Sequence, residues 1–132
     1  MITALDTSVI LDVISDDKTH LKRSLTAIRK ASSEGSLVIC ECVLAEIRPA
    51  LPEPDVEKLL EDWLLNFKPS TKESALLAGA MYQKYLGRSR APSRVLPDFL
   101  IGAHAQVHCD RLLARDRGYY RDYFHGLELM EP

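Results

Sequence analysis

The chain has 132 residues, of which 46% are hydrophobic and 27% are charged, and its formal net charge is −2. This length favours a single domain over residues 1–132, because two comfortable hydrophobic cores would need a longer chain. No apolar run approaches the length that crosses a bilayer, and the N-terminus shows no basic start and no cleavage-site pattern. We therefore expect a cytoplasmic protein without membrane contact. Its three cysteines cannot all pair within the chain, so we expect reduced thiols.

The first forty residues predict a strand, helical segments and a second strand. Residues 1–5 are a short apolar run that is typical of a buried strand, and apolar residues with helical spacing follow at 9–14. Residues 18–33 form an amphipathic pattern, and residues 37–40 are apolar and partly β-branched, which favours another buried strand. Two strands joined by a helical crossover predict a parallel sheet with helices on both faces.

The remainder of the chain continues the alternation of helices and strands. Short helical spacing covers 42–51, and apolar residues at helical spacing over 56–67 and 71–87 predict two further helices that form a hairpin. The later segments are an irregular basic stretch at 87–94, a buried helix at 97–108, a strand at 111–114 and an edge strand at 127–129.

Four acidic residues have similar places in this plan. Asp6 follows the first strand, Glu46 lies in the helix after the second strand, Asp98 opens the buried helix, and Asp116 follows the strand at 111–114. The carboxyl ends of parallel strands line one edge of a sheet, so these acids are expected to meet there. Clustered carboxylates repel one another unless a cation intervenes, and hard oxygen ligands favour Mg²⁺ or Mn²⁺.

Each acid also has a structural alternative when it is taken alone. Asp6 can be a helix cap or turn residue, and Asp116 a turn residue before Gly118. Asp98 can be a favourable charge in the first turn of a helix, and Glu46 can be a solvated helix residue.

The distribution of charge adds a second signal. Residues 84–122 carry eight basic and four acidic side chains, and seven of the eight are arginines. Guanidinium groups bind phosphate through paired hydrogen bonds, so this part of the chain suits a polyanion; a set of solvated surface arginines is the alternative. The candidates for binding such a polyanion are Arg88, Arg90, Arg94, Arg115 and Arg117.

The acids stand in the segments LDTSV (5–9), VLAEI (43–47), PDFLIGAHA (97–105) and LLARDRGYY (112–120). In this order, the segments resemble the four acidic motifs of PIN-domain ribonucleases, and more narrowly those of VapC-type toxins of toxin–antitoxin pairs. The resemblance spans nearly the whole chain, and its first and third motifs are the more specific. Many relatives have Thr or Ser where this chain has Ala114, a difference that affects hydrogen bonding inside the acidic cluster.

The resemblance implies a three-layer α/β/α fold with a central parallel sheet of four to five strands. It implies a metal-dependent endoribonuclease, a toxin that hydrolyses RNA and is restrained by a cognate antitoxin, and it suggests a homodimer. Carried over by position, Asp6 and Asp98 would be the main Mg²⁺ ligands, and Asp116 would complete the site directly or through water. Glu46 would bind a second metal or orient the attacking water.

Other functions share some of these features. A PIN-like RNA-processing or RNA-binding module that is not a toxin is the main alternative. A receiver-like signalling domain also uses clustered acids and Mg²⁺, but it needs a lysine on a late strand, and no lysine follows Lys84. A haloacid-dehalogenase-like phosphatase would need a second acid two residues after Asp6, where this chain has Ser8.

Overall fold

The computed structural model describes residues 1–88, 95–116 and 118–132, and its centre is a five-stranded sheet. All paired strands are parallel, in the order β3-β2-β1-β4-β5. This order differs from the receiver order 2-1-3-4-5, which argues against the receiver-like alternative. The predicted sheet of four to five parallel strands is confirmed. The strands are β1 (Ile2–Leu5), β2 (Ser36–Ile39), β3 (Leu65–Phe67), β4 (Arg111–Leu113) and β5 (Leu129–Met130).

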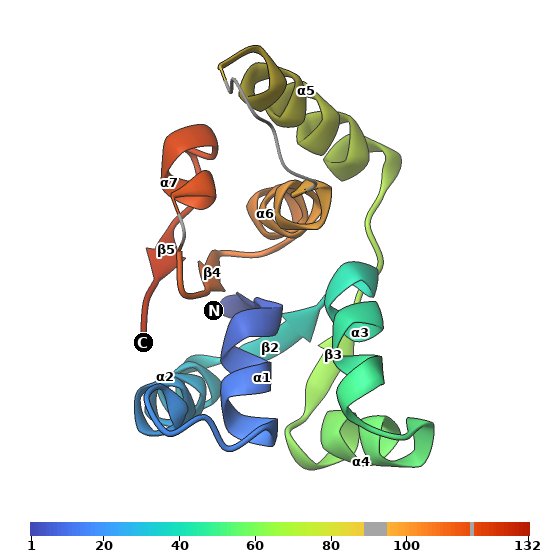
Figure 1. Ribbon diagram of the computed structural model, residues 1–132, viewed down its shortest axis with the longest axis vertical. Coiled ribbons are helices and arrows are strands. Elements are labelled where there is room, and N and C mark those ends of the chain that lie inside the picture. Colours follow the sequence, from blue (N-terminus) through green and yellow to red (C-terminus); the bar gives the residue numbers. More distant parts are fainter. Residues whose placement is uncertain (89–94, 117) are drawn as a thin grey trace.

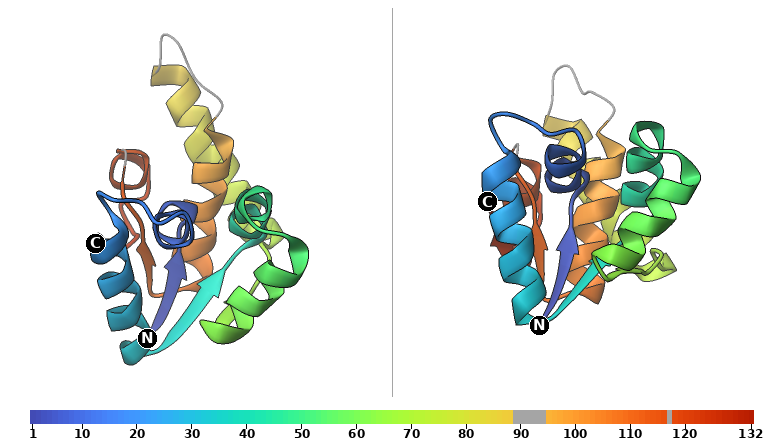
Figure 2. Two further views of the ribbon diagram at one scale, coloured as in Figure 1. Left: turned by 60° about the horizontal axis from the view of Figure 1, so that its bottom comes forward. Right: turned by 90° about the horizontal axis from the view of Figure 1, so that it is seen from below.

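Helices cover both faces of the sheet and complete the expected three-layer α/β/α architecture (Figure 1). Helix α2 lies on one face and α6 on the other, with α5 outside α6 (Figure 2). No helix in the described part of the chain is long and apolar enough to span a membrane. The helices are α1 (Thr7–Ile14), α2 (Leu21–Glu34), α3 (Glu41–Ile47), α4 (Glu53–Asp62), α5 (Lys72–Arg88), α6 (Leu96–His108) and α7 (Tyr119–Tyr123), with a 3₁₀ turn at Arg48–Ala50.

The three central strands are buried on both faces. Every residue of β4 is buried, as are the last three residues of both β1 and β2. Strands that are covered by helices on both sides have continuous apolar runs instead of an alternating pattern. Burial on both faces therefore explains the continuous apolar runs at 1–5 and 37–40 that predict strands.

The predicted helix over 56–67 is wrong in its second half. Helix α4 ends at Asp62, and β3 then pairs with β2 at the edge of the sheet. Between them, Leu64 has a positive φ of 54°, which an α-helix does not accommodate. The helical spacing is maintained by Leu64 and Phe67, but these side chains are 75% and 47% exposed, so the spacing does not reflect a buried helical face.

The predicted hairpin of the helices over 56–67 and 71–87 is also wrong. Helices α4 and α5 lie at opposite ends of the molecule, with β3 between them in the chain (Figure 1). Helix α5 instead packs on α6, where the rings of Tyr82 and Tyr85 both lie 5.5 Å from the ring of Phe99. The apolar surface that suggested a helix pair is therefore used against a third helix.

A buried carboxylate joins three separate segments at the carboxyl edge of the sheet. Asp12, on α1, is 3% exposed and accepts a hydrogen bond of 2.6 Å from the hydroxyl of Ser24 on α2. The guanidinium of Arg115, which follows β4, donates to both oxygens of Asp12, through Nε and Nη2 at 2.9 Å each. Asp12 thus fixes α1 against α2 and against the segment that follows β4.

Asp12→Ala should lower the free energy of unfolding by about 2–4 kcal/mol, because it leaves the Ser24 hydroxyl buried and the Arg115 guanidinium without its partner. The loss is limited because the Arg115 side chain is 37% exposed and can be hydrated. Chemical denaturation measures this change. Asp62→Ala on the exposed surface of α4 is the control and should change stability by no more than about 0.5 kcal/mol. Equal denaturation midpoints for the two variants would contradict the assigned role of Asp12.

Candidate active site

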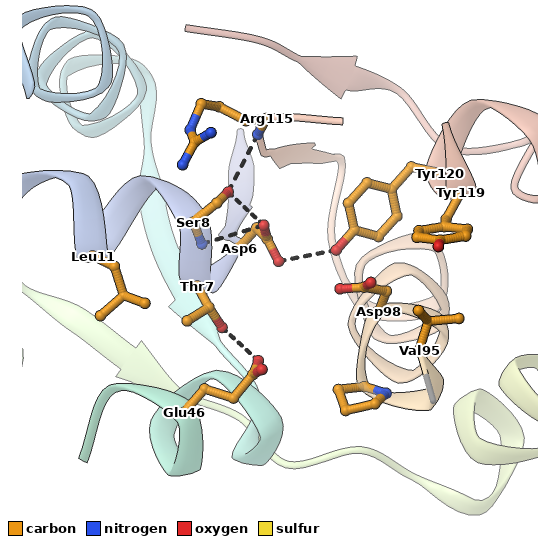
Figure 3. A pocket seen from close by; sticks show the side chains of 11 residues that line it. Asp6, Thr7, Ser8, Leu11, Glu46, Val95, Asp98, Arg115, Tyr119 and Tyr120 are labelled. Atoms are coloured by element: carbon orange, nitrogen blue, oxygen red, sulfur yellow. Dashed lines mark hydrogen bonds between the residues drawn. The ribbon is translucent and has the colours of Figure 1, made fainter. Parts of the chain in front are cut away.

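A cavity of about 320 Å³ opens at the carboxyl end of β1 (Figure 3). Residues from α1, α3, α6 and the segment around α7 contribute to its wall, so parts that are distant in the sequence meet there. Three of the four predicted acids line it, together with one of the predicted arginines. The lining residues are Asp6, Thr7, Ser8, Leu11, Glu46, Val95, Pro97, Asp98, Arg115, Tyr119 and Tyr120.

Asp6 lies where β1 becomes α1, and its carboxylate is almost fully enclosed. Its backbone N–H donates to the carbonyl of Leu113 at 2.9 Å, which extends the pairing of β1 with β4. Asp6 is only 6% exposed. One carboxylate oxygen, Oδ2, accepts the hydroxyl of Ser8 at 2.5 Å and the backbone N–H of Ser8 at 3.3 Å. The two roles considered for Asp6 therefore coexist: it caps α1 and also faces the cavity.

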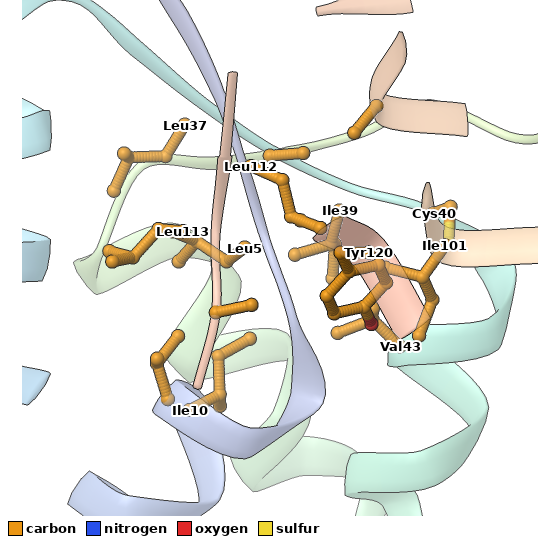
Figure 4. Packing of buried hydrophobic residues seen from close by; sticks show 14 of the residues in the cluster. Leu5, Ile10, Leu37, Ile39, Cys40, Val43, Ile101, Leu112, Leu113 and Tyr120 are labelled. Atoms are coloured by element: carbon orange, nitrogen blue, oxygen red, sulfur yellow. The ribbon is translucent and has the colours of Figure 1, made fainter. Parts of the chain in front are cut away.

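The other oxygen of Asp6 is held by a tyrosine from the far end of the chain. The hydroxyl of Tyr120 donates to Oδ1 of Asp6 at 2.9 Å. Tyr120 is 4% exposed, and its ring belongs to the buried hydrophobic cluster (Figure 4). Burial raises the pKa of Tyr120 well above its usual value, and the negative charges of Asp6 and Asp98 raise it further. The phenol therefore stays protonated at neutral pH and acts as a donor.

Glu46 and Asp98 approach the cavity from two other helices. Glu46 lies on the exposed side of α3, and its Oε1 accepts the hydroxyl of Thr7 at 2.7 Å. Asp98 is half-buried in the first turn of α6, and its carboxylate faces the Asp6–Tyr120 pair across the cavity (Figure 3). Two consecutive hydroxyls of α1, those of Thr7 and Ser8, thus orient the carboxylates of Glu46 and Asp6.

Asp116, the fourth predicted acid, does not line the cavity. Its carboxylate turns into the start of α7, where it accepts the backbone N–H groups of Gly118, Tyr120 and Arg121 at 2.9, 3.2 and 3.3 Å. The Nε of Arg121 lies 3.7 Å from Oδ2, and the Asp116 side chain has no exposed surface. The structure therefore places Asp6, Glu46 and Asp98 in the lining of one cavity and directs the Asp116 carboxylate to the start of α7. Its assignment as a metal ligand stays a prediction.

The predicted arginines fall into three groups. Arg115 lines the cavity, where the pair with Asp12 fixes the direction of its guanidinium. Arg88 lies at the end of α5, and its guanidinium carbon is 5.3 Å from the centre of the Tyr123 ring. Arg90, Arg94 and Arg117 lie outside the described residues, so their predicted contact with RNA stays a prediction.

The donor atoms around the cavity suit a small, hard cation. Asp6, Glu46 and Asp98 offer carboxylate oxygens, the ligands that Mg²⁺ and Mn²⁺ prefer. Within the described ranges, no three acidic, histidine or cysteine side chains form a group that could surround a metal ion. Mg²⁺ commonly keeps several of its waters and binds through one or two carboxylates. Asp6 and Asp98 therefore fit a hydrated ion.

Sequence reasoning missed two features of the cavity. The sequence carries a signal for Ser8, since a hydroxyl residue two positions after a capping aspartate is well placed to bond to it. The sequence carries no such signal for Tyr120, because Tyr119, Tyr120 and Tyr123 are the same residue type within one short segment. Only the direction in which α7 faces selects the tyrosine that reaches Asp6.

Comparison with known proteins places this geometry in a family. The model of the PIN domain matches residues 3–124. One similar solved structure is VapBC2 from Rickettsia felis bound to a promoter DNA fragment, with a TM-score of 0.73 and 18% identity over 99% of this chain and 98% of that chain. Another is VapBC-1 from nontypeable Haemophilus influenzae, with a TM-score of 0.72 and 19% identity over 99% of this chain and 98% of that chain. VapC20 from Mycobacterium tuberculosis, a sarcin–ricin loop cleaving toxin, is also similar, with a TM-score of 0.58 and 12% identity over 91% of this chain and 94% of that chain. No curated protein sequence matches. Since the family model covers nearly the whole sequence, the chain belongs to the PIN-domain family.

Proposed function

We propose that this protein is a divalent-metal-dependent endoribonuclease, the VapC-type toxin of a toxin–antitoxin pair. The observation that carries the proposal is the meeting of three carboxylates, those of Asp6, Glu46 and Asp98, in one cavity of a PIN-domain chain. The similarity to VapC20, which is described as a toxin that cleaves the sarcin–ricin loop, supports RNA as the substrate. The similarity to VapBC structures supports a cognate antitoxin as a partner. A homodimer and a cytoplasmic location stay predictions.

In the proposed reaction, the chain's own groups bind the cation and position the reactants. Asp6 and Asp98 would hold Mg²⁺ or Mn²⁺, and the bound ion would supply positive charge beside the scissile phosphate and the attacking water. Glu46, whose orientation is fixed by Thr7, lies at the exposed side of the cavity, where it can orient that water. The Arg115 guanidinium uses Nε and Nη2 on Asp12, which leaves Nη1 to donate to a phosphate oxygen.

Asp6→Asn and Asp98→Asn should each reduce RNA cleavage in Mg²⁺ by about 100-fold or more, because each removes charge from the proposed cation site. Both should also relieve growth inhibition on expression. The fold should persist, since asparagine caps a helix as well as aspartate does. Cleavage of a labelled RNA measures the effect, with Asp62→Asn on exposed α4 as the matched control. If either variant cleaved RNA at the wild-type rate, the metal assignment would be refuted. If the wild-type protein bound RNA but did not cleave it, the RNA-binding alternative would be favoured.

Replacing Arg88, Arg90 and Arg94 together by alanine should weaken RNA binding and reduce the slope of log affinity against log salt by about 2–3, since each phosphate contact releases about one counterion. Binding of a single-stranded RNA over a series of salt concentrations measures this slope. The control replaces three exposed cations of α2, Lys22, Arg23 and Lys30, and so makes the same change in net charge. Equal slopes for the two triple variants would show that bulk charge, and not the 88–94 segment, governs binding.

A further inference from the structure

The fourth acidic residue faces away from the cavity that the other three share. Both oxygens of Asp116 accept backbone N–H groups from the start of α7, and its side chain is fully buried. These groups lie at the first turn of the helix, where N–H groups have no partner within the helix. The carboxylate of Asp116 thus caps the start of α7.

Helix α7 is short, so its position depends on a few contacts. It spans Tyr119–Tyr123, far fewer residues than an isolated helix needs for stability in water. It also packs on α6 and α5. The rings of Tyr119 and Tyr123 lie 5.9 and 5.3 Å from the ring of Phe99 on α6, and 5.7 and 6.1 Å from the ring of Tyr85 on α5. A Cβ on Gly102 would lie 2.7 Å from a ring carbon of Phe124 and 3.1 Å from one of Tyr120, so the absence of a side chain there allows this close approach. The cap at Asp116, the close approach at Gly102 and these ring contacts together fix where α7 lies.

Helix α7 positions the hydroxyl of Tyr120 at the cavity. That hydroxyl binds Oδ1 of Asp6, while Ser8 occupies Oδ2. With two donors from Ser8 on Oδ2 and one from Tyr120 on Oδ1, the plane of the Asp6 carboxylate is fixed, and the lone pairs left for a cation point in set directions. Hydrogen bonds to a metal-binding carboxylate orient it and commonly change metal affinity or activity by about 10–100-fold.

We infer that Tyr120 and Asp116 are positioning residues of this site: Asp116 holds α7, and α7 holds the Tyr120 hydroxyl on the carboxylate of Asp6. This inference rests on the proposed function, since it gives Asp6 the role of a cation ligand. It predicts that the effect of Asp116 passes through Tyr120, whereas a direct ligand would act independently of it.

The experiment measures two quantities for each variant: Mn²⁺ affinity of the purified protein by calorimetry, and kcat and KM for cleavage of a labelled RNA. Tyr120→Phe keeps the buried ring and removes the hydroxyl. It should lower Mn²⁺ affinity or kcat by about 10–100-fold with little change in KM. The control is Tyr82→Phe, which removes a hydroxyl from a ring of α5 that packs on Phe99 of α6, and it should match the wild type.

Replacement of Asp116 distinguishes the two roles. Asp116→Ala should lower Mn²⁺ affinity or kcat by about the same factor as Tyr120→Phe. The double variant should show no larger a loss than either single variant, because both changes remove the same contact. Asp116→Asn should recover most of that loss, since its amide oxygen still accepts N–H groups from the first turn of α7. If Asp116→Ala does not fold, Asp116→Asn and Tyr120→Phe still decide the question.

Two results would overturn the inference. One is an Asp116→Asn variant as deficient in Mn²⁺ binding as Asp6→Asn while Tyr120→Phe matches the wild type, which would make Asp116 a direct ligand. The other is a double variant in which the fold-losses of Tyr120→Phe and Asp116→Ala multiply, because independent effects would show that Asp116 does not act through Tyr120. Failure of the proposed function has a different signature: a wild type that binds Mn²⁺ and loses that affinity on Tyr120→Phe, yet cleaves no RNA, supports the positioning roles and refutes the nuclease.

Discussion

Negative charge gathered at one edge of the sheet is the constraint on which the rest of this structure depends. Asp6 is almost fully enclosed and faces Asp98 across a small cavity, and carboxylates placed in this way repel one another. The surrounding chain offsets part of that repulsion with hydrogen bonds. Asp6 accepts three from Ser8 and Tyr120, and Glu46 accepts one from Thr7. A bound cation would offset the remainder, which is why the same geometry suits metal-dependent chemistry.

The donors to these acids come from segments that are far apart in the sequence. Helix α1 supplies two hydroxyls in its first turn, and α7, more than a hundred residues later, supplies the phenol. The backbone N–H of Arg115 also donates to the hydroxyl of Ser8 at 3.3 Å. The pair of buried Asp12 and partly exposed Arg115 holds α1 against the segment that follows β4, so the stability of this edge and the orientation of the acids share the same contacts.

The comparisons establish the family and the fold, whereas the chemistry has to be argued from the side chains. The similar solved structures are 12–19% identical to this chain, a level at which backbone architecture is shared and individual side chains need not be. Asp116 illustrates the difference. It stands in the expected place in the sequence, shortly after β4, but its carboxylate accepts hydrogen bonds from the start of α7. A sequence motif locates a residue along the chain, but the contacts of that residue depend on the side chains and backbone packed around it.

The sequence by itself determined strands β1, β2 and β4, the helices that alternate with them, the parallel sheet and the edge at which three of the four predicted acids gather. These follow from local apolar patterns and from the rule that parallel strands end on the same side. Tertiary structure alone decided that residues 65–67 form a strand, that Asp12 is buried, and that Tyr120, and not Tyr119 or Tyr123, holds Asp6. The reason is physical: helical spacing records which residues can share a face, but the partner of that face is set by segments distant in the chain.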